Sequence, residues 1–297
     1  MNPTTDPIAA VPSVALSGTG LPDAATAEAV EMPVIGLGTW PLTGTEARDA
    51  VVRALQSGYR HVDTAEKYGN EDAVGAGVRE SGIDRDQVFI TSKLMNTSFG
   101  GTDAVRAGLE ATLERMGLTH LDLYLIHWPN PGRTDQEGTF LQTAEALAEL
   151  SGTALLRAWG VSNFTPAHLD QLVQRELIPA VNQIQVDPWI RQRDVEQANS
   201  AAGVHTVAYT PLGRGGELFE VAEVTGPAQR LDVTPAQVLL RWHVQSGRVA
   251  VPKSADPLRQ RQNLDVFGFE LTSEEMAALE RLDTAAGPRL DPDEYGH

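Results

Sequence analysis

The sequence predicts an α/β protein, a (β/α)8 TIM barrel formed as a single domain. From Met32 onward, short apolar runs rich in β-branched residues alternate eight times with segments of helical period. This alternation is typical of repeated parallel βα units. No Pro/Gly/Ser linker and no repeat of solenoid length divides the chain, so we expect residues 31–297 to form one barrel with a C-terminal tail.

Each expected strand is a short apolar run that is bounded by turn or capping residues. Their spacing along the chain fits βα units, and a barrel of this type occupies about 250 residues, which the 297 residues accommodate. The expected strands are 34–37, 60–63, 88–92, 121–127, 157–161, 180–185, 204–209 and 248–252.

The segments between the strands carry helix signals. A helix before Gly58 is indicated by apolar residues at three- and four-residue steps, namely Ala47, Ala50, Val51, Ala54 and Leu55. Thr43 and Glu46 match a capping box at its start, and Gly58 is a typical stop. Further helix starts are predicted where a threonine precedes a first-turn proline or a residue of capping-box spacing, at Thr165-Pro166, Thr234-Pro235 with Gln237, and Thr272 with Glu275.

The first 30 residues are rich in Ala, Pro, Thr and Gly, contain no Lys or Arg, and show no sustained period. We therefore expect residues 1–30 to be a flexible extension, with a short strand near Val14–Leu16 as the one alternative.

Composition excludes several classes of function. The chain has no cysteine, so disulfides, thiolate nucleophiles and Cys-ligated metals are excluded. A net charge of −17 disfavours nucleic acid and anionic membranes as partners. The N-terminus does not resemble a secretory signal, and no apolar run approaches the roughly 20 residues of a membrane helix. We expect a soluble, cytoplasmic monomer without a metal site.

Polar side chains lie at the ends of the predicted strands. In a (β/α)8 barrel the carboxyl ends of all strands meet at one rim, where catalytic groups gather. The residues placed there are Asp63, Lys93, His127, Ser162, Asn163, Gln183 and Tyr209.

Four side chains at or near this rim suit carbonyl reduction, which needs a proton donor for the developing alkoxide. Tyr68 can be that acid, although lowering its pKa from about 10 to about 7 takes roughly 4 kcal/mol. We expect Lys93 to supply much of this, Asp63 to hold the ammonium, and His127 to orient the substrate oxygen. Singly, each has a structural interpretation as a helix cap, a solvated lysine or a core histidine, but their convergence favours chemistry.

A glycosidase is the alternative function that two nearby carboxylates suggest. Asp63 and Glu66 form such a pair, but their separation in sequence fits no required distance between the two carboxyl groups. The glycosidase hypothesis also leaves Lys93 without a role.

Six segments of the sequence resemble the aldo-keto reductases in their order along the chain, from Met32 to about Asp283. They are MPVIGLGTW at 32–40, HVDTAEKYGNEDAVG at 61–75, LIHWP at 125–129, GVSNF at 160–164, YTPLGRG at 209–215 and VPKS at 251–254. The tail GPRLDPDE at 287–294 is similar to prokaryotic members of the 2,5-diketo-gluconic acid reductase type.

The resemblance implies an NADPH-dependent oxidoreductase that acts on small aldehydes or ketones. Asp63, Tyr68, Lys93 and His127 match the catalytic tetrad. The remaining matches concern NADPH/NADP+: Ser162, Asn163 and Gln183 hold the nicotinamide carboxamide, Tyr209 stacks on the ring, and Leu212 also lines the cofactor site.

A second cofactor segment follows the eighth predicted strand, where barrels commonly form a phosphate site. The resemblance places the adenosine 2′-phosphate and adenine against Lys253, Ser254, Arg259, Gln262 and Asn263. The alternative is a solvated basic patch. No Gly-x-Gly-x-x-Gly fingerprint indicates a Rossmann domain.

Three tryptophans near the same rim, Trp40, Trp128 and Trp189, are expected to wall an apolar substrate pocket, with a place in the core as the alternative for one or more of them. The sequence departs from the family pattern at NQIQVDP, where Gln185 and Asp187 replace the usual Glu and His and affect either substrate contacts or packing. The alternative function, an NADPH-binding redox sensor on the same barrel, is disfavoured by the intact tetrad.

Overall fold

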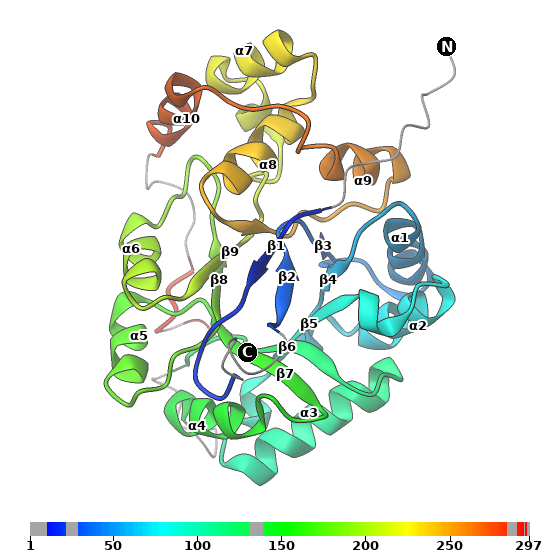
Figure 1. Cartoon of the computed structure of the whole chain (residues 1–297), viewed down its shortest axis with the longest axis vertical. Helices are drawn as coiled ribbons and strands as arrows, with labels where there is room; N and C mark the ends of the chain where they lie inside the picture. Colours follow the sequence, from blue (N-terminus) through cyan, green and yellow to red (C-terminus); the bar gives the residue numbers. More distant parts are fainter. Residues whose placement is uncertain (1–10, 22–28, 131–138, 284–289, 294, 296–297) are drawn as a thin grey trace.

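The computed structural model describes residues 11–21, 29–130, 139–283, 290–293 and 295, and its main element is an eight-stranded parallel sheet (Figure 1). The strand order β10-β9-β8-β7-β6-β5-β4-β3 follows the chain without interruption. These strands are β3 (Leu37–Gly38), β4 (His61–Asp63), β5 (Phe89–Leu94), β6 (Leu121–Ile126), β7 (Leu156–Ser162), β8 (Val181–Gln185), β9 (His205–Tyr209) and β10 (Val249–Ala250).

The first and last strands of the sheet meet. Parallel bridges join Ile35 to Ala250 and Gly38 to Lys253. A Cβ atom on Gly38 would lie 2.6 Å from the Val251 carbonyl oxygen, so glycine permits this approach. The curled sheet is thus consistent with a (β/α)8 barrel, and all eight predicted strands are confirmed, although the first pairs mainly at 37–38 rather than over 34–37.

Helices alternate with the strands and surround the sheet (Figure 1). They are α1 (Gly44–Gln56), α2 (Glu71–Glu80), α3 (Thr102–Met116), α4 (Phe140–Leu150), α5 (Pro166–Val173), α6 (Arg193–Ala201), α7 (Ala222–Leu231), α8 (Pro235–Gln245), α9 (Pro257–Leu264) and α10 (Ser273–Glu280). Four short 3-10 turns accompany them, at η1 (Glu66–Tyr68), η2 (Arg85–Gln87), η3 (Asn96–Ser98) and η4 (Gly216–Phe219). Among the described residues, no helix is long and apolar enough to cross a membrane.

The predicted helix starts are confirmed with one exception. Thr165, Thr234 and Thr272 each accept a hydrogen bond from the backbone N–H three residues on, and all three form capping boxes. The capping box predicted at Thr43 is wrong, because its side chain makes no capping hydrogen bond. Gly44 enters α1 with a φ of 50°, which changes the direction in which the chain meets the helix.

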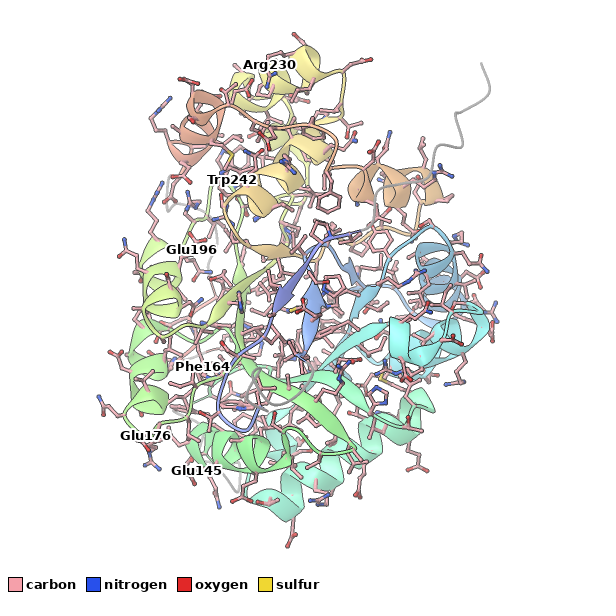
Figure 2. All side chains as sticks on the ribbon, viewed as in Figure 1. Glu145, Phe164, Glu176, Glu196, Arg230 and Trp242 are labelled. Carbon is pink, nitrogen blue, oxygen red and sulfur yellow. The ribbon has the colours of Figure 1, made fainter. Side chains whose placement is uncertain are left out.

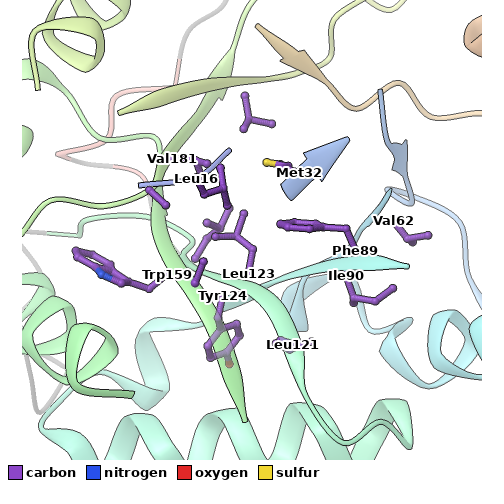
Figure 3. Close-up of a cluster of buried hydrophobic side chains, with 14 of the residues drawn as sticks. Leu16, Met32, Val62, Phe89, Ile90, Leu121, Leu123, Tyr124, Trp159 and Val181 are labelled. Carbon is purple, nitrogen blue, oxygen red and sulfur yellow. The ribbon is translucent and has the colours of Figure 1, made fainter. Parts of the chain in front are cut away.

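Three apolar clusters lie among the described residues, two of them large and one small, the small one formed by Leu42, Ala47, Ala50 and Ala73. The larger runs through the strands and includes Met32, Phe89, Tyr124 and Trp159, which are at most 4% exposed (Figure 3). The second lies between β8, β9 and helices α6, α7, α8 and α10, and contains the fully buried Trp242 of α8 (Figure 2).

The expectation of a flexible N-terminal extension is corrected for the residues that the structure describes. Strand β1 (Ser13–Ala15) pairs antiparallel with β2 (Glu31–Pro33), and Leu16 is 7% exposed within the larger cluster (Figure 3). The Trp159 indole donates to the Thr19 carbonyl at 2.7 Å. This hairpin therefore packs on the barrel, whereas residues 1–10 and 22–28 lie outside the described residues.

Replacing Leu16 by Ala should lower the free energy of unfolding in urea by about 2 kcal/mol or more, because buried Leu→Ala changes typically cost 2–5 kcal/mol. The matched control is Leu258→Ala, since Leu258 is 64% exposed and its loss should cost less than about 1 kcal/mol. Equal unfolding free energies for the two variants would contradict the packing role of the hairpin.

Candidate active site

The parallel register brings the predicted residues to one end of the sheet. Asp63 ends β4, Ser162 ends β7 and Tyr209 ends β9. Lys93 and Gln183 lie within β5 and β8, each short of the final residue. The other three follow strand ends: Tyr68 closes the 3-10 turn η1, His127 directly follows β6, and Asn163 directly follows β7.

A buried ion pair lies at the centre of this group. Lys93 Nζ donates to Asp63 Oδ1 at 2.6 Å and to the Thr64 carbonyl at 2.8 Å, and the side chains of Lys93 and Asp63 are 1% and 5% exposed. Burial lowers the pKa of the Lys93 ammonium, whereas Asp63 and Tyr68 raise it. Their combined effect is larger than that of burial, so the pKa lies above its usual value. Lys93 is therefore a fixed cation.

Tyr68 lies next to this cation. Lys93 Nζ donates to Tyr68 Oη at 3.4 Å and is 5.1 Å from the ring centroid. Burial raises the pKa of the Tyr68 phenol, Lys93 lowers it and Asp63 raises it, with a net increase. The expectation that Lys93 brings this pKa toward neutrality is thus wrong for this structure, because desolvation outweighs a cation that Asp63 partly neutralises. The phenol remains protonated near neutral pH and can donate to an alkoxide, which is a far stronger base than a phenolate.

Aromatic rings surround the phenol. The His127 ring packs edge-on to Tyr68 with centroids 5.8 Å apart, and Trp40, which is 58% exposed, lies 5.2 Å from Tyr68. Trp128 is 6% exposed and packs edge-on against Tyr295. Trp189 packs instead on the second apolar cluster, so its contact with substrate remains a prediction.

The four residues predicted to hold the nicotinamide form a connected set of hydrogen bonds. Ser162 Oγ donates to the Gln183 carbonyl at 2.8 Å, and Asn163 Nδ2 donates to Ser162 Oγ at 3.1 Å. Tyr209 Oη donates to Asn163 Oδ1 at 2.8 Å. Gln183 Nε2 also donates to Asp63 Oδ2, so the amide and hydroxyl groups lie beside the Lys93–Asp63 pair.

The charged residues of the second predicted cofactor segment are partly or largely exposed and include charges of both signs. Lys253 is exposed, and the Arg259 side chain is 72% exposed. Asp256 caps α9 by accepting from the Arg259 backbone N–H at 2.9 Å, and its carboxylate is 3.9 Å from Arg259 Nε. Asp256 was not predicted from the sequence, although Asp256-Pro257 is the same kind of helix start as Thr165-Pro166.

The other residues predicted for the cofactor lie nearby in chain order but differ in burial. Ser254 is buried, and its Oγ accepts from the Asp256 backbone N–H at 3.1 Å. Asn263 is 3% exposed, and Gln262 is half-buried. Leu212 is also half-buried and packs against both large apolar clusters.

Two further features support the rim, and the first of them, the contacts of Arg115, could not be found from local sequence patterns. Arg115 of α3 donates to Glu71 Oε2 at 2.7 Å and lies 3.5 Å from Glu66, so it joins α2 to the turn that carries Tyr68. Asp187 is 2% exposed and accepts from the Trp189 and Ile190 backbone N–H groups. The departure at Asp187 therefore serves packing of a turn.

Within the described residues, no group of three or more His, Asp or Glu side chains could hold a metal ion. The polar groups of the rim are instead engaged with one another. The site thus offers a fixed cation, a protonated phenol and a row of amide and hydroxyl groups.

A parallel α/β barrel with such groups at the carboxyl rim belongs to the class of barrel enzymes that carry their chemistry on βα loops. The chain belongs to the Aldo/keto reductase family, whose model matches residues 34–284. It is therefore an oxidoreductase of that family, and the resemblance found in the sequence is confirmed.

The similarity to known proteins extends over nearly the whole chain. The chain is 41% identical over 261 residues to 2,5-diketo-D-gluconic acid reductase B of Corynebacterium sp., covering 88% of this chain and 92% of that protein. It is 40% identical over 277 residues to morphine 6-dehydrogenase of Pseudomonas putida, covering 89% and 91%. The crystal structure of a Bombyx mori aldo-keto reductase in complex with NADP has a TM-score of 0.82 at 30% identity, covering 94% of each chain.

Replacing Lys93 by Met should lower the free energy of unfolding by about 3 kcal/mol, because removing one partner leaves a buried charge uncompensated. The double variant Lys93→Met/Asp63→Leu should recover part of this loss, since it removes the remaining charge as well. Urea denaturation measures both. A double variant less stable than the single one would show that the charge is not the cause.

Proposed function

We propose that this protein reduces aldehydes or ketones to alcohols with NADPH, using Tyr68 as general acid. The observation that carries the proposal is the Tyr68 hydroxyl 3.4 Å from the Lys93 ammonium, beside the hydrogen-bonded set of Ser162, Asn163 and Gln183. When bound, NADPH supplies the hydride.

The side chains of the rim account for the remaining steps. A substrate carbonyl oxygen that accepts from Tyr68 Oη gains a proton as negative charge develops on it. Lys93 stabilises the phenolate that remains, and Asp63 keeps the ammonium in place. His127, edge-on to Tyr68, orients the oxygen, and Trp40 shields the phenol from water on the exposed side.

The residues also fit the two ends of a dinucleotide. Amide and hydroxyl groups of Ser162, Asn163 and Gln183 suit a carboxamide, because both are hydrogen-bond donors and acceptors. Lys253 and Arg259 are exposed cations near the start of α9, which suits a phosphate on a chain of net charge −17. A Bombyx mori relative of known structure binds NADP.

The proposal is tested by following the absorbance of reduced nicotinamide with NADPH and a panel of carbonyl compounds. The panel includes 2,5-diketo-D-gluconic acid, and morphine is tested with NADP+ in the reverse direction, because relatives are named for these two compounds. NADPH binding without turnover of any compound would favour the redox sensor instead.

Tyr68→Phe should lower kcat at least about 100-fold, because general acid catalysis is commonly worth 10² to 10⁴, while the Kd for NADPH changes by no more than a few fold. Tyr124→Phe is the matched control, since this buried tyrosine hydrogen-bonds Thr112 on α3 away from the rim. Near-normal turnover of the Tyr68 variant would remove the proposed acid.

Arg259→Ala should weaken NADPH binding about tenfold or more and leave NADH binding almost unchanged, because a charge-assisted hydrogen bond contributes about 1.5–3 kcal/mol. Asp256→Asn keeps a capping side chain but removes the opposing charge, so it should strengthen NADPH binding. Both effects should shrink with added salt.

The control for this charge series is Arg261→Ala, an exposed arginine on the same helix, which should change the NADPH Kd little. Fluorescence titration with each cofactor measures all four proteins. Equal weakening of NADPH and NADH by Arg259→Ala would mean that Arg259 has a structural role, and an unmodified protein that prefers NADH would exclude the phosphate assignment.

A further inference from the structure

One hydrogen bond crosses the interior of the barrel. Strand β8 is four strands away from β4 in the sheet, yet Gln183 Nε2 donates to Asp63 Oδ2 at 2.7 Å. Both residues are buried, with 1% and 3% of their surface exposed. The contact therefore joins the strand that carries Gln183 to the strand that carries the partner of Lys93.

The two oxygens of Asp63 are divided between two donors. Oδ1 accepts from Lys93 at 2.6 Å and Oδ2 accepts from Gln183. A buried carboxylate oxygen without a donor is costly, and a carboxylate held at one oxygen alone can rotate. The hydrogen bond from Gln183 thus fixes the orientation of the Asp63 carboxylate, with Oδ1 directed toward Lys93.

The same hydrogen bond fixes the orientation of the Gln183 amide. An ionised carboxylate only accepts, so the amide must direct its NH2 group toward Asp63. The amide oxygen Oε1 is then the end that can accept from the NH2 group of a nicotinamide carboxamide. One side chain therefore connects the predicted cofactor contact to the ion pair beside the general acid.

We infer that Gln183 is a positioning residue for proton transfer, which holds Asp63 against Lys93 in addition to its contact with the cofactor. This inference rests on the proposed function. Its effect reaches Tyr68 through charge, since Lys93 lowers the pKa of Tyr68 and Asp63 raises it.

The other groups around Asp63 set the direction of the expected change. His61 lies on the same strand, and burial lowers its pKa to about 4, so it is neutral near pH 7. His127 faces Tyr68 from the end of β6. Lys93 is the fixed cation. Loss of the Gln183 donor leaves the Asp63 charge less compensated, which raises the pKa of Tyr68 further.

The test compares Gln183→Met with Ser162→Ala. Both remove a group predicted to hold the carboxamide, but Ser162 Oγ donates to the Gln183 backbone carbonyl and not to Asp63. Fluorescence titration gives the Kd for NADPH, and kcat is measured across pH with saturating cofactor and substrate.

Both variants should weaken NADPH binding. Activity requires protonated Tyr68, so it falls as pH rises through the pKa of that phenol. In Gln183→Met this fall should move to higher pH by roughly half a unit or more, and kcat should drop at least about tenfold. In Ser162→Ala the pH profile should match the unmodified protein.

The variant Gln183→Glu provides a second, independent test of the positioning role. When protonated, the Glu carboxyl can donate to Asp63 as the amide does, and when ionised it cannot. Its kcat should therefore approach that of the unmodified protein at low pH and fall through an ionisation that Gln183→Met lacks.

Identical pH profiles for Gln183→Met and Ser162→Ala would overturn the positioning role and leave the reductase proposal intact. Failure of the unmodified protein to turn over any carbonyl compound would overturn the reductase proposal and this inference together.

Discussion

The buried ion pair between Lys93 and Asp63 is the interaction on which the site depends. An ammonium that is 1% exposed can stay charged only with close acceptors, and Asp63 and the Thr64 carbonyl provide them at 2.6 and 2.8 Å. Both acceptors come from the end of β4, one strand away from Lys93. The buried ammonium is therefore stable only when β4 pairs with β5 in the observed register.

From this pair, hydrogen bonds extend across the barrel mouth. Asp63 contacts Gln183, whose backbone carbonyl accepts from Ser162, and Ser162 accepts from Asn163, which accepts from Tyr209. These residues come from β4, β7, β8 and β9, so a shift of any one strand would disturb the others. The groups proposed for the cofactor and those proposed for proton transfer thus form one network.

The two ends of the proposed cofactor site differ in electrostatic character. The charges beside Tyr68 are buried, so salt screens them little, and they are suited to controlling a proton. Lys253, Asp256 and Arg259 are partly or largely exposed, so their interactions are weaker and depend on salt. We expect chemistry to be decided at the buried end and the choice between cofactors at the exposed end.

The sequence by itself determined the eight strands, the helix starts at Thr165, Thr234 and Thr272, and the rim residues. Period, capping residues and strand ends are local signals, and parallel strands end on one side. Only the tertiary structure decided how these residues pair. The Gln183–Asp63 contact joins residues 120 positions apart, Arg115 reaches Glu71 from another helix, and β1 pairs with β2 across residues 16–30. The direction in which the pKa of Tyr68 is shifted could likewise not be predicted from the sequence. It depends on the balance between burial and the two opposite charges of Lys93 and Asp63, whose distances from the phenol are set by the fold.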